Sequence, residues 1–186
     1  MSTHEMIDAD IILSFKSLMA IKDFDEISVF DIAKGAHITR RAFYNHYKDK
    51  YDLVSSIFSK EVMNRALELT DINTWDEGSI LICNYLHNNR EYYAKLIHIR
   101  GQNSLQEQFL NLTRKQTDIL IKEVEGSRTL SKGDAEFLTK YLFYAYIGIL
   151  EDWIKSDNPY SPEDFVLRWK TLLNKVLHNY IDKFAQ

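Results

Sequence analysis

Apolar residues recur at intervals of three and four along most of the chain, which is the spacing of an α-helix with one buried face. The pattern predicts helices over residues 5–22, 29–36 and 40–47, and another that begins after Asp49. The apolar face of the first helix consists of Ile11, Ile12, Phe15, Leu18 and Met19. No stretch shows a convincing period-two alternation of the kind that marks a half-buried strand. The pattern therefore predicts an all-α protein.

Longer helices are predicted in the second part of the chain. Thr74 and Glu77 have the spacing of a capping box and predict a helix start, and residues 91–99 predict a shorter helix. Cap residues also mark the remaining helix starts. The remaining predicted helices are residues 105–125, a helix that Ser131 caps and that extends through Trp153, and a last helix that begins with Ser161 and Pro162. The complete pattern amounts to about nine helices.

Turn-forming residues are scarce, with 6 Gly and 2 Pro among 186 residues. Average usage would supply roughly 13 Gly and about 9 Pro. Doubly wound α/β folds and β-sandwiches need many turns, so this scarcity favours long helices joined by short loops. The length fits one large domain or two small ones. Because the predicted helices become longer after Tyr51, we expect an N-terminal domain over residues 1–50 and a C-terminal domain over residues 51–186.

The net charge of −4 by itself disfavours a nucleic-acid partner, because DNA phosphates attract basic surfaces. The charge is distributed unevenly, however. Residues 1–33 carry two basic and seven acidic residues, a net charge of −5, whereas residues 34–50 carry five basic residues against Asp49, a net charge of +4. The strongest basic cluster therefore coincides with two short predicted helices and the tight turn between them.

Two short helices joined by a turn of three or four residues describe a helix-turn-helix, whose second helix enters the major groove of DNA. In the second predicted helix, Phe43 and Tyr47 lie four residues apart and are expected to face a small core. Arginine can bind guanine edges and asparagine adenine edges. A solvated charged face on an ordinary helix pair is the alternative. The side chains that this arrangement leaves outward are Arg40, Arg41, Tyr44, Asn45 and Lys48.

The same segment contains a longer motif. A hydroxyl residue stands before each helix of the pair, an Ile-Ala pair lies in the first helix, and a Phe-Tyr pair lies in the second. The residues that carry the motif are Ser28, Ile32, Ala33, Thr39, Phe43, Tyr44, Tyr47, Lys50 and Leu53. Over about 50 residues, the chain resembles the DNA-binding domain of the TetR/AcrR family of transcriptional regulators.

This resemblance implies a three-helix DNA-binding domain followed by an all-helical effector-binding and dimerisation domain. It also implies a homodimer that binds a palindromic operator in double-stranded DNA, in most cases as a repressor, and that responds to an unknown small-molecule effector. The roles that it implies are helix capping and phosphate contact for Ser28 and Thr39, DNA-backbone contact for Tyr44, His46 and Lys50, and base contact for Arg40, Arg41 and Asn45.

Three features depart from the family pattern. His37 stands where the family usually has Gly in the turn, a position expected to need positive φ. Arg41 and Ala42 occupy positions where small residues and Thr are usual, so the operator sequence does not follow from the resemblance. The first helix is acidic where many relatives have a basic arm, which disfavours additional minor-groove contacts.

The last two helices are expected to form the dimer interface, because half-site recognition requires a two-fold protein. Ala145 and Gly148 would allow close helix approach, and the last helix has more apolar surface than one domain needs. The alternative is that both helices only fill the core of one chain. The expected interface residues are Ala145, Gly148, Ile149, Trp153, Phe165, Trp169, Leu172, Leu173, Val176 and Tyr180.

Aromatic residues of the C-terminal domain could line an apolar effector pocket, although such residues also serve as ordinary core. The three histidines of this domain have no recognisable metal-ligand spacing, so neither a metal nor a cofactor is predicted. The single cysteine, Cys83, is expected to be a buried, inert thiol. The candidate pocket residues are Tyr85, Tyr92, Tyr93, Phe109, Tyr141 and Tyr144.

Two other classes of function are weighed against the regulator. No phosphate-binding loop, nucleophile motif or metal site supports an enzyme. A helical small-molecule-binding protein or a protein-interaction scaffold without DNA binding remains open, and steep salt dependence of DNA binding would exclude both. The N-terminus has no signal-peptide pattern and no stretch could span a membrane, so a cytoplasmic protein is expected.

Overall fold

The computed structural model describes residues 3–68, 74–100, 104–126, 128–157 and 160–186. These residues form ten α-helices, one 3₁₀ turn and one π-helical turn, and no strand occurs among them. The all-α prediction is confirmed. None of the helices within these ranges is long and apolar enough to cross a membrane.

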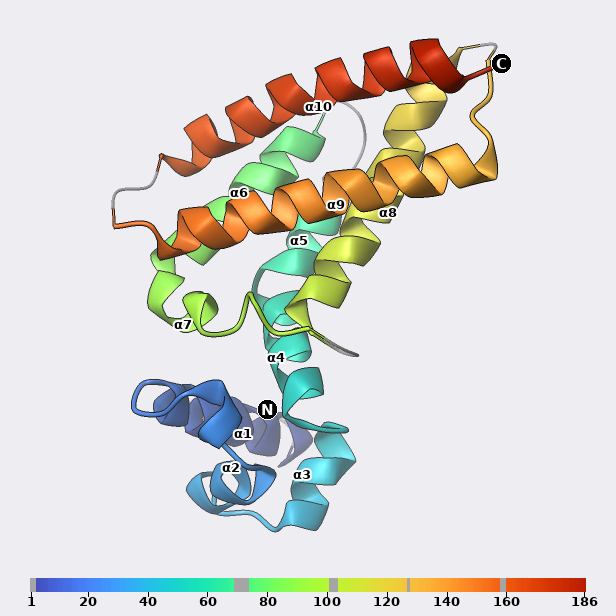
Figure 1. Cartoon of the computed structure of the whole chain (residues 1–186). Coiled ribbons are helices and arrows are strands. Elements are labelled where there is room, and N and C mark those ends of the chain that lie inside the picture. Colours follow the sequence, from blue (N-terminus) through green and yellow to red (C-terminus); the bar gives the residue numbers. More distant parts are fainter. Residues whose placement is uncertain (1–2, 69–73, 101–103, 127, 158–159) are drawn as a thin grey trace.

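The N-terminal part forms a small head at one end of the molecule (Figure 1). Ser28 and Thr39 cap α2 and α3 as predicted, because their side chains accept hydrogen bonds from the backbone N–H groups of Asp31 and Ala42. The first helix ends at Met19, before the predicted residue 22. The head consists of α1 (Thr3–Met19), the 3₁₀ turn η1 (Phe24–Glu26), α2 (Val29–Gly35) and α3 (Arg40–His46).

A nearly continuous helical segment leads from the head into the larger bundle (Figure 1). It comprises α4 (Lys50–Phe58), the π-helical turn η2 (Ser59–Met63) and α5 (Asn64–Leu67). The first turn of α4 belongs to the head, since the rings of Tyr51 and Phe24 lie 5.1 Å apart. Its later part belongs to the bundle, since Gln108 Nε2 donates a hydrogen bond of 2.7 Å to the Ser55 carbonyl. The domain boundary at residues 50 and 51 stays a prediction.

The bundle contains three long helices, of which α9 and α10 lie side by side at the end farthest from the head (Figure 1). The predicted caps Ser131 and Ser161 are confirmed. Thr74 precedes α6 but does not form the predicted capping box, because its hydroxyl is buried without a hydrogen-bond partner. The bundle helices are α6 (Trp75–Asn88), α7 (Arg90–Ala94), α8 (Leu105–Glu125), α9 (Lys132–Lys155) and α10 (Pro162–Phe184).

One hydrophobic cluster runs from the head into the bundle. It includes Phe15 of α1, Phe43 of α3, Phe58 of α4 and Phe109 of α8, all of which are buried. Cys83 belongs to the same cluster, and burial raises the pKa of its thiol to about 12. The prediction of a buried thiol is confirmed, and the head is joined to the bundle by core packing.

Candidate nucleic-acid interface

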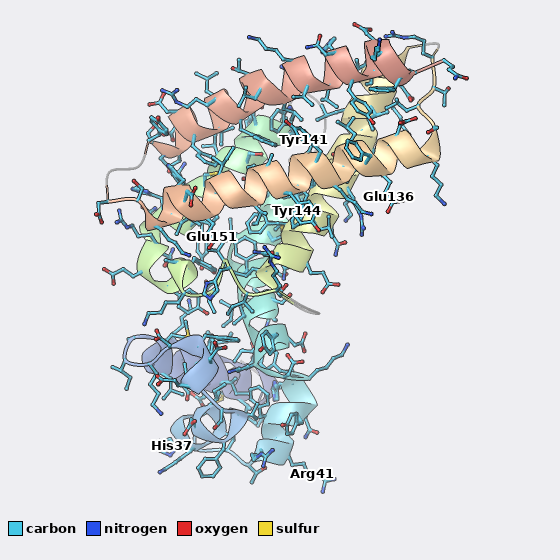
Figure 2. All side chains as sticks on the ribbon, in the orientation of Figure 1. His37, Arg41, Glu136, Tyr141, Tyr144 and Glu151 are labelled. Atoms are coloured by element: carbon cyan, nitrogen blue, oxygen red, sulfur yellow. The ribbon has the colours of Figure 1, made fainter. Side chains whose placement is uncertain are left out.

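The outer face of α3 carries the side chains that the sequence assigned to base edges, Arg40, Arg41 and Asn45. Phe43 and Tyr47 are buried, and the opposite face is open to solvent. Figure 2 shows Arg41 at the end of the molecule most distant from α9. The predicted division of this helix into a core face and a solvent face is therefore confirmed. The exposed residues of this face, together with Lys48 just beyond the helix, are Arg40, Arg41, Tyr44, Asn45 and Lys48.

The basic side chains of this face are available to an anionic partner. Within the described part of the chain, Arg40, Arg41 and Lys48 form no ion pair with a carboxylate of this protein. The Arg40 guanidinium lies 6.0 Å from the centre of the Tyr44 ring, within the range of a cation–π contact. Their positive charge is thus not neutralised internally, as a phosphate-binding surface requires.

The turn between α2 and α3 depends on an unusual backbone conformation at His37 and on close packing at Gly35. His37 has a φ of 56°, which confirms the positive φ expected where relatives carry Gly. Ile38 N–H then donates a hydrogen bond of 2.9 Å to the Ala33 carbonyl and closes the turn. Gly35 packs against α1 so closely that a Cβ atom there would overlap the Ser14 hydroxyl. This hydroxyl donates a hydrogen bond of 2.8 Å to the Ile32 carbonyl, so α1 directly supports the turn.

His46 does not lie where a contact with the DNA backbone would need it. Its side chain is 5% exposed, and its Nδ1 lies 3.9 Å from Asp8 Oδ1. Its ring stacks on that of His4, with a centroid separation of 4.0 Å. The side chain therefore faces α1 instead of the solvent side of α3, and the geometry does not support the phosphate contact expected from the resemblance.

Lys50 is likewise engaged inside the head. Its Nζ donates hydrogen bonds of 2.7 Å and 2.9 Å to the carbonyls of Phe24 and Ile27, and it lies 4.3 Å from the centre of the Phe24 ring. Burial lowers the pKa of its ammonium group. Because these contacts join the start of α4 to η1, the geometry favours a structural role for Lys50 over the expected phosphate contact.

Comparison with known proteins identifies the family. A sequence profile described as "Bacterial regulatory proteins, tetR family" matches residues 16–57, and one described as "Transcriptional regulator C-terminal region" matches residues 73–175, more than half of the chain. This chain belongs to the TetR family. It is a DNA-binding transcriptional regulator, and the head is its helix-turn-helix domain.

Several members of the family resemble this TetR regulator in sequence or fold. The "HTH-type dhaKLM operon transcriptional activator DhaS" of Lactococcus lactis subsp. lactis (strain IL1403) is 28% identical over 147 residues, which cover 78% of each chain. A solved structure of the dihydroxyacetone kinase operon activator DhaS has 26% identity and a TM-score of 0.58, and covers 97% of this chain and 98% of its own.

More distant structures show the same fold. A TetR transcriptional regulator from Streptococcus agalactiae 2603V has a TM-score of 0.63 at 20% identity, covering 91% of this chain and 94% of its own. The TetR-family repressor FadR of Thermus thermophilus, solved with lauroyl-CoA, has a TM-score of 0.64 at 15% identity, covering 90% of this chain and 93% of its own.

In this TetR regulator, the predicted effector-pocket residues separate into two groups. Tyr85, Tyr93 and Phe109 belong to one aromatic cluster around Phe58, to which Tyr92 is joined through Tyr93. The other two residues lie on the outer face of α9, where Tyr141 is 51% and Tyr144 is 63% exposed (Figure 2). A single pocket formed by all six residues was therefore a wrong prediction, because the sequence pattern did not distinguish the two faces of α9.

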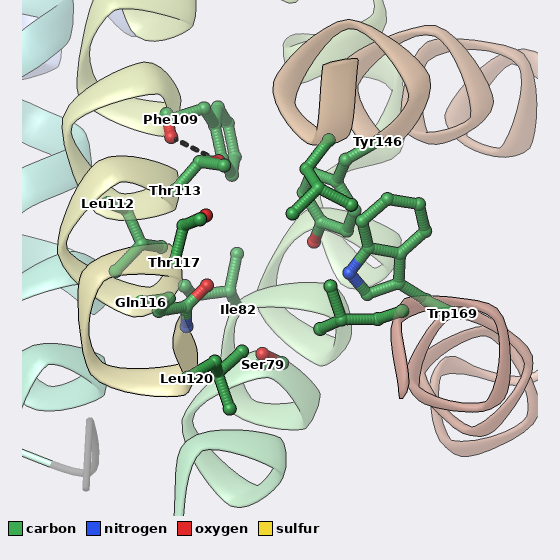
Figure 3. Close-up of a pocket in the computed structure, with 12 residues that line it drawn as sticks. Ser79, Ile82, Phe109, Leu112, Thr113, Gln116, Thr117, Leu120, Tyr146 and Trp169 are labelled. Atoms are coloured by element: carbon green, nitrogen blue, oxygen red, sulfur yellow. Dashed lines mark hydrogen bonds between the residues drawn. The ribbon is translucent and has the colours of Figure 1, made fainter. Parts of the chain in front are cut away.

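The structure instead shows a narrow pocket with a cavity volume of about 20 Å³ between α6, α8, α9 and α10 (Figure 3). Phe109 is the one predicted pocket residue that lines it. Three polar residues of α8, Thr113, Gln116 and Thr117, share the face that points into the cavity, and their spacing in the sequence could have revealed it. The other residues around the cavity are Ser79, Ile82, Leu112, Leu120, Leu142, Tyr146, Trp169 and Leu173.

The predicted dimer residues also divide by burial. Trp153, Phe165 and Leu173 are buried within the chain itself, at 5%, 4% and 5% exposure, so little of each side chain is left for a second copy, and their place in the interface stays a prediction. Ala145, Trp169, Val176 and Tyr180 are half-buried, and Gly148, Ile149 and Leu172 are exposed. Five large apolar residues that the sequence analysis did not place in the interface are exposed on the same two helices: Phe137, Tyr141, Tyr144, Leu167 and Phe184.

Proposed function

We propose that this TetR regulator is a homodimer that binds a palindromic operator through the exposed face of α3 and responds to a small-molecule effector. The observation that carries the DNA-binding part is the set of unpaired basic side chains beside Tyr44 and Asn45 on α3. Arginine and asparagine have the geometry to bind base edges, whereas Tyr44 and Lys48 suit phosphates. Arg40, Arg41 and Asn45 are the proposed base-contacting residues.

The test is duplex binding by the full chain to an operator selected from random DNA. Arg41→Ala is expected to weaken binding roughly 5- to 150-fold, since a good base contact contributes about 1–3 kcal/mol. Tyr44→Ala is expected to weaken binding about tenfold or more, since a hydrogen bond to a charged group contributes about 1.5–3 kcal/mol. Lys115→Ala removes an exposed basic residue of α8 and is the matched control.

The same binding experiment distinguishes the proposed function from its alternatives. Steep weakening of wild-type binding with rising salt is expected, because bound phosphates release counterions. Equal operator affinities in wild type, Arg41→Ala and Tyr44→Ala would contradict the proposed α3 interface. Salt-insensitive or absent duplex binding would favour a carrier or a protein-interaction scaffold.

The proposed dimer surface is the outer side of α9 and α10. Two open grooves, of about 390 Å³ and 370 Å³, lie between these helices, and their lining is largely apolar. Exposed apolar surface of this extent on two adjacent helices is typical of a protein interface. A two-fold axis through this surface would place both heads on one side of the dimer, as two half-sites require.

The proposed effector site is the cavity between α6, α8, α9 and α10. No charged side chain lines it, and Ser79, Thr113, Gln116 and Thr117 provide neutral hydrogen-bonding groups. A buried charge without a partner is strongly unfavourable, so this lining favours an uncharged effector. Typical ligand pockets measure about 300–1,000 Å³, so binding would require α8 to move apart from α9 and α10.

The direction of regulation is proposed from the family. Repression is typical of TetR regulators, whereas DhaS is named as an activator. We propose repression, exerted in the cytoplasm and without enzymatic activity. A promoter–reporter assay in cells with and without the gene tests this direction, because loss of a repressor raises reporter output and loss of an activator lowers it.

A further inference from the structure

A groove on the head lies between α1 and the turn that joins α2 to α3. It has a volume of about 460 Å³, with Leu13, Leu18 and Ile21 on one side and Ala36 and His37 on the other. Ile21 and Leu13, at 77% and 67% exposure, are the two most exposed large apolar side chains in the described part of the chain. Single apolar residues are common on protein surfaces, whereas a group of them along one groove marks an interaction site.

The floor of this groove is formed by a tight contact between α1 and α2. Ser14 and Gly35 line the groove, and the Ser14 hydroxyl occupies the space that a side chain at Gly35 would need. The same hydroxyl donates a hydrogen bond of 2.8 Å to the Ile32 carbonyl. The groove is therefore already formed in the free protein, which lowers the entropic cost of binding a partner.

The groove has the length of a short helix. Asp10, Leu13, Ser17 and Ile21 follow one another at intervals of three and four residues, so they form one stripe along α1 and the turn after it. This stripe extends about 16 Å, which matches about three turns of a partner helix. The described part of the head contains no strand to which an extended peptide could add. A helix lying in the groove is therefore the recognition mode that fits.

The charge around the groove favours a basic partner. Asp10 lines the groove, is exposed, and forms no ion pair within the described part of the chain. Residues 1–33 as a whole carry a net charge of −5. Figure 2 shows His37, on the far side of the groove, at the same end of the head as Arg41. Operator phosphates bound by α3 would lie near this end, and they too attract basic side chains.

Two other occupants fit the groove less well. DNA is disfavoured, because the lining is largely apolar and Asp10 would repel phosphates. A second copy of the chain has its proposed surface on α9 and α10, at the end of the molecule opposite the head (Figure 1). The groove is thus left free in the proposed dimer.

We propose that this groove binds an amphipathic helix of another protein, which carries aliphatic side chains on one face and lysines or arginines along its flanks. The aliphatic side chains pack on Leu13 and Ile21, and one flanking cation pairs with Asp10. The partner is thereby held beside the operator while Arg41 stays free to contact DNA. The proposal rests on the proposed function only for the position of the operator, because binding of a helix can be tested without DNA.

The probe is a fluorescein-labelled peptide with leucines on one helical face and lysines on the other, and fluorescence anisotropy measures its binding to the full DNA-free chain. Leu13→Ser and Ile21→Ser are each expected to weaken binding roughly tenfold, since each removes a large aliphatic contact. Both side chains are exposed, so the melting temperature is expected to stay unchanged. Ile119→Ser is the matched control, because this 38% exposed side chain of α8 lies outside the groove. It is expected to leave peptide binding unchanged.

The basic character of the partner has its own test. Asp10→Lys is expected to weaken binding of the leucine–lysine peptide about fivefold, the upper range for an exposed ion pair. The same variant is expected to strengthen binding of a leucine–glutamate peptide of equal length. An identical response of the two peptides to Asp10→Lys contradicts the basic partner.

The other occupants give different results. Leu13→Ser is expected to keep wild-type operator affinity and to remain a dimer. A loss of operator affinity would assign the groove to DNA, and a monomer would assign it to a second copy. Either result overturns the proposal, as does a leucine–lysine peptide that fails to bind wild type or binds it and both groove variants equally. Failure of the Arg41→Ala test leaves these peptide measurements unaffected, so the two failures are distinguishable.

The promoter–reporter assay tests the consequence in cells. The Leu13→Ser and Ile21→Ser double variant is expected to shift reporter output towards that of cells without the gene, because the partner is no longer held beside the operator. Ile119→Ser is expected to give wild-type output. Wild-type output from the double variant as well overturns the proposal.

Discussion

At the scale of single residues, the DNA-binding head depends on close contacts that pattern alone could not supply. His37 was recognisable from the sequence, since it occupies a turn position that needs positive φ. Gly35 was not, because its importance comes from the approach of α1, whose Ser14 hydroxyl lies where a Cβ atom would be. The two residues lie two positions apart in the chain but are constrained for different reasons, His37 by its own backbone and Gly35 by the approach of α1.

Gly35→Ala is expected to destabilise the protein by about 1–3 kcal/mol, the usual range for an overpacked contact. Thermal unfolding measures the effect. Gly133→Ala is the matched control, because a Cβ atom there would lie 3.8 Å from the Ser131 hydroxyl, an ordinary contact distance. Equal melting temperatures for the two variants would show that α1 and α2 separate without strain.

His46 is expected to make the stability of the head depend on pH. Burial lowers its pKa below the ordinary value of 6.5, and His4 and Lys60 add to this effect, whereas Asp8 opposes it. The unfolded chain therefore takes up the proton more readily than the folded chain. The stabilising contribution of neutral His46 is present above pH 6.5 and is lost as the pH falls through the lower pKa of the folded state.

Urea unfolding of wild type and His46→Phe at pH 7.5 and 5.5 measures this contribution. Phenylalanine keeps a ring that can stack on His4 but cannot titrate. Wild type is expected to lose more stability than His46→Phe on acidification. The same loss in both proteins would assign the pH dependence to other groups.

At the scale of elements, the two helices α9 and α10 have an inner and an outer apolar face. The inner faces, with Trp153 and Phe165, complete the core of the chain. The outer faces carry Tyr144 and Leu172, which no other part of the described chain covers. The sequence showed that these helices contain more apolar residues than one core needs, but the face assigned to each residue depends on how the helices are rotated against α6 and α8.

Tyr144→Glu is expected to convert the proposed dimer into a monomer without unfolding it, because this side chain is 63% exposed in the single chain. Sedimentation velocity measures the oligomeric state and circular dichroism the fold. Leu13→Glu places the same charge at a side chain of α1 that is 67% exposed, and it is expected to leave the dimer intact. A Tyr144→Glu protein that still sediments as a dimer would place the interface elsewhere.

At the scale of the whole molecule, the DNA-binding surface and the proposed dimer surface lie at opposite ends of the chain's fold. The chain has a net charge of −4, yet its basic cluster lies on the exposed end of the head, far from α9 and α10. The hydrophobic cluster joins the two ends, and Lys60 and Glu61 of η2 add ion pairs with Asp8 and Lys16 of α1. A change near α6 can therefore alter the head through contacts already present, which is the physical requirement for control of DNA binding by an effector.

The sequence by itself determined the features that arise within a few residues of chain. The existence of the helices, the caps at Ser28, Thr39, Ser131 and Ser161, the two faces of α3 and the family motif all depend on local spacing, and the structure agrees with them. The helices predicted over residues 5–22 and 91–99 end earlier, at Met19 and Ala94. Thr74 is the exception, because its hydroxyl is buried away from the N–H group that it was expected to cap.

Only the tertiary structure decided which elements meet. It directed His46 and Lys50 into the head, separated Tyr141 and Tyr144 from the effector cavity, and placed Trp153 and Phe165 inside the chain. Each outcome depends on a partner that is distant in sequence. The local spacing of apolar residues indicates that a helix has an apolar face, whereas the position and rotation of the neighbouring helices decide what covers that face.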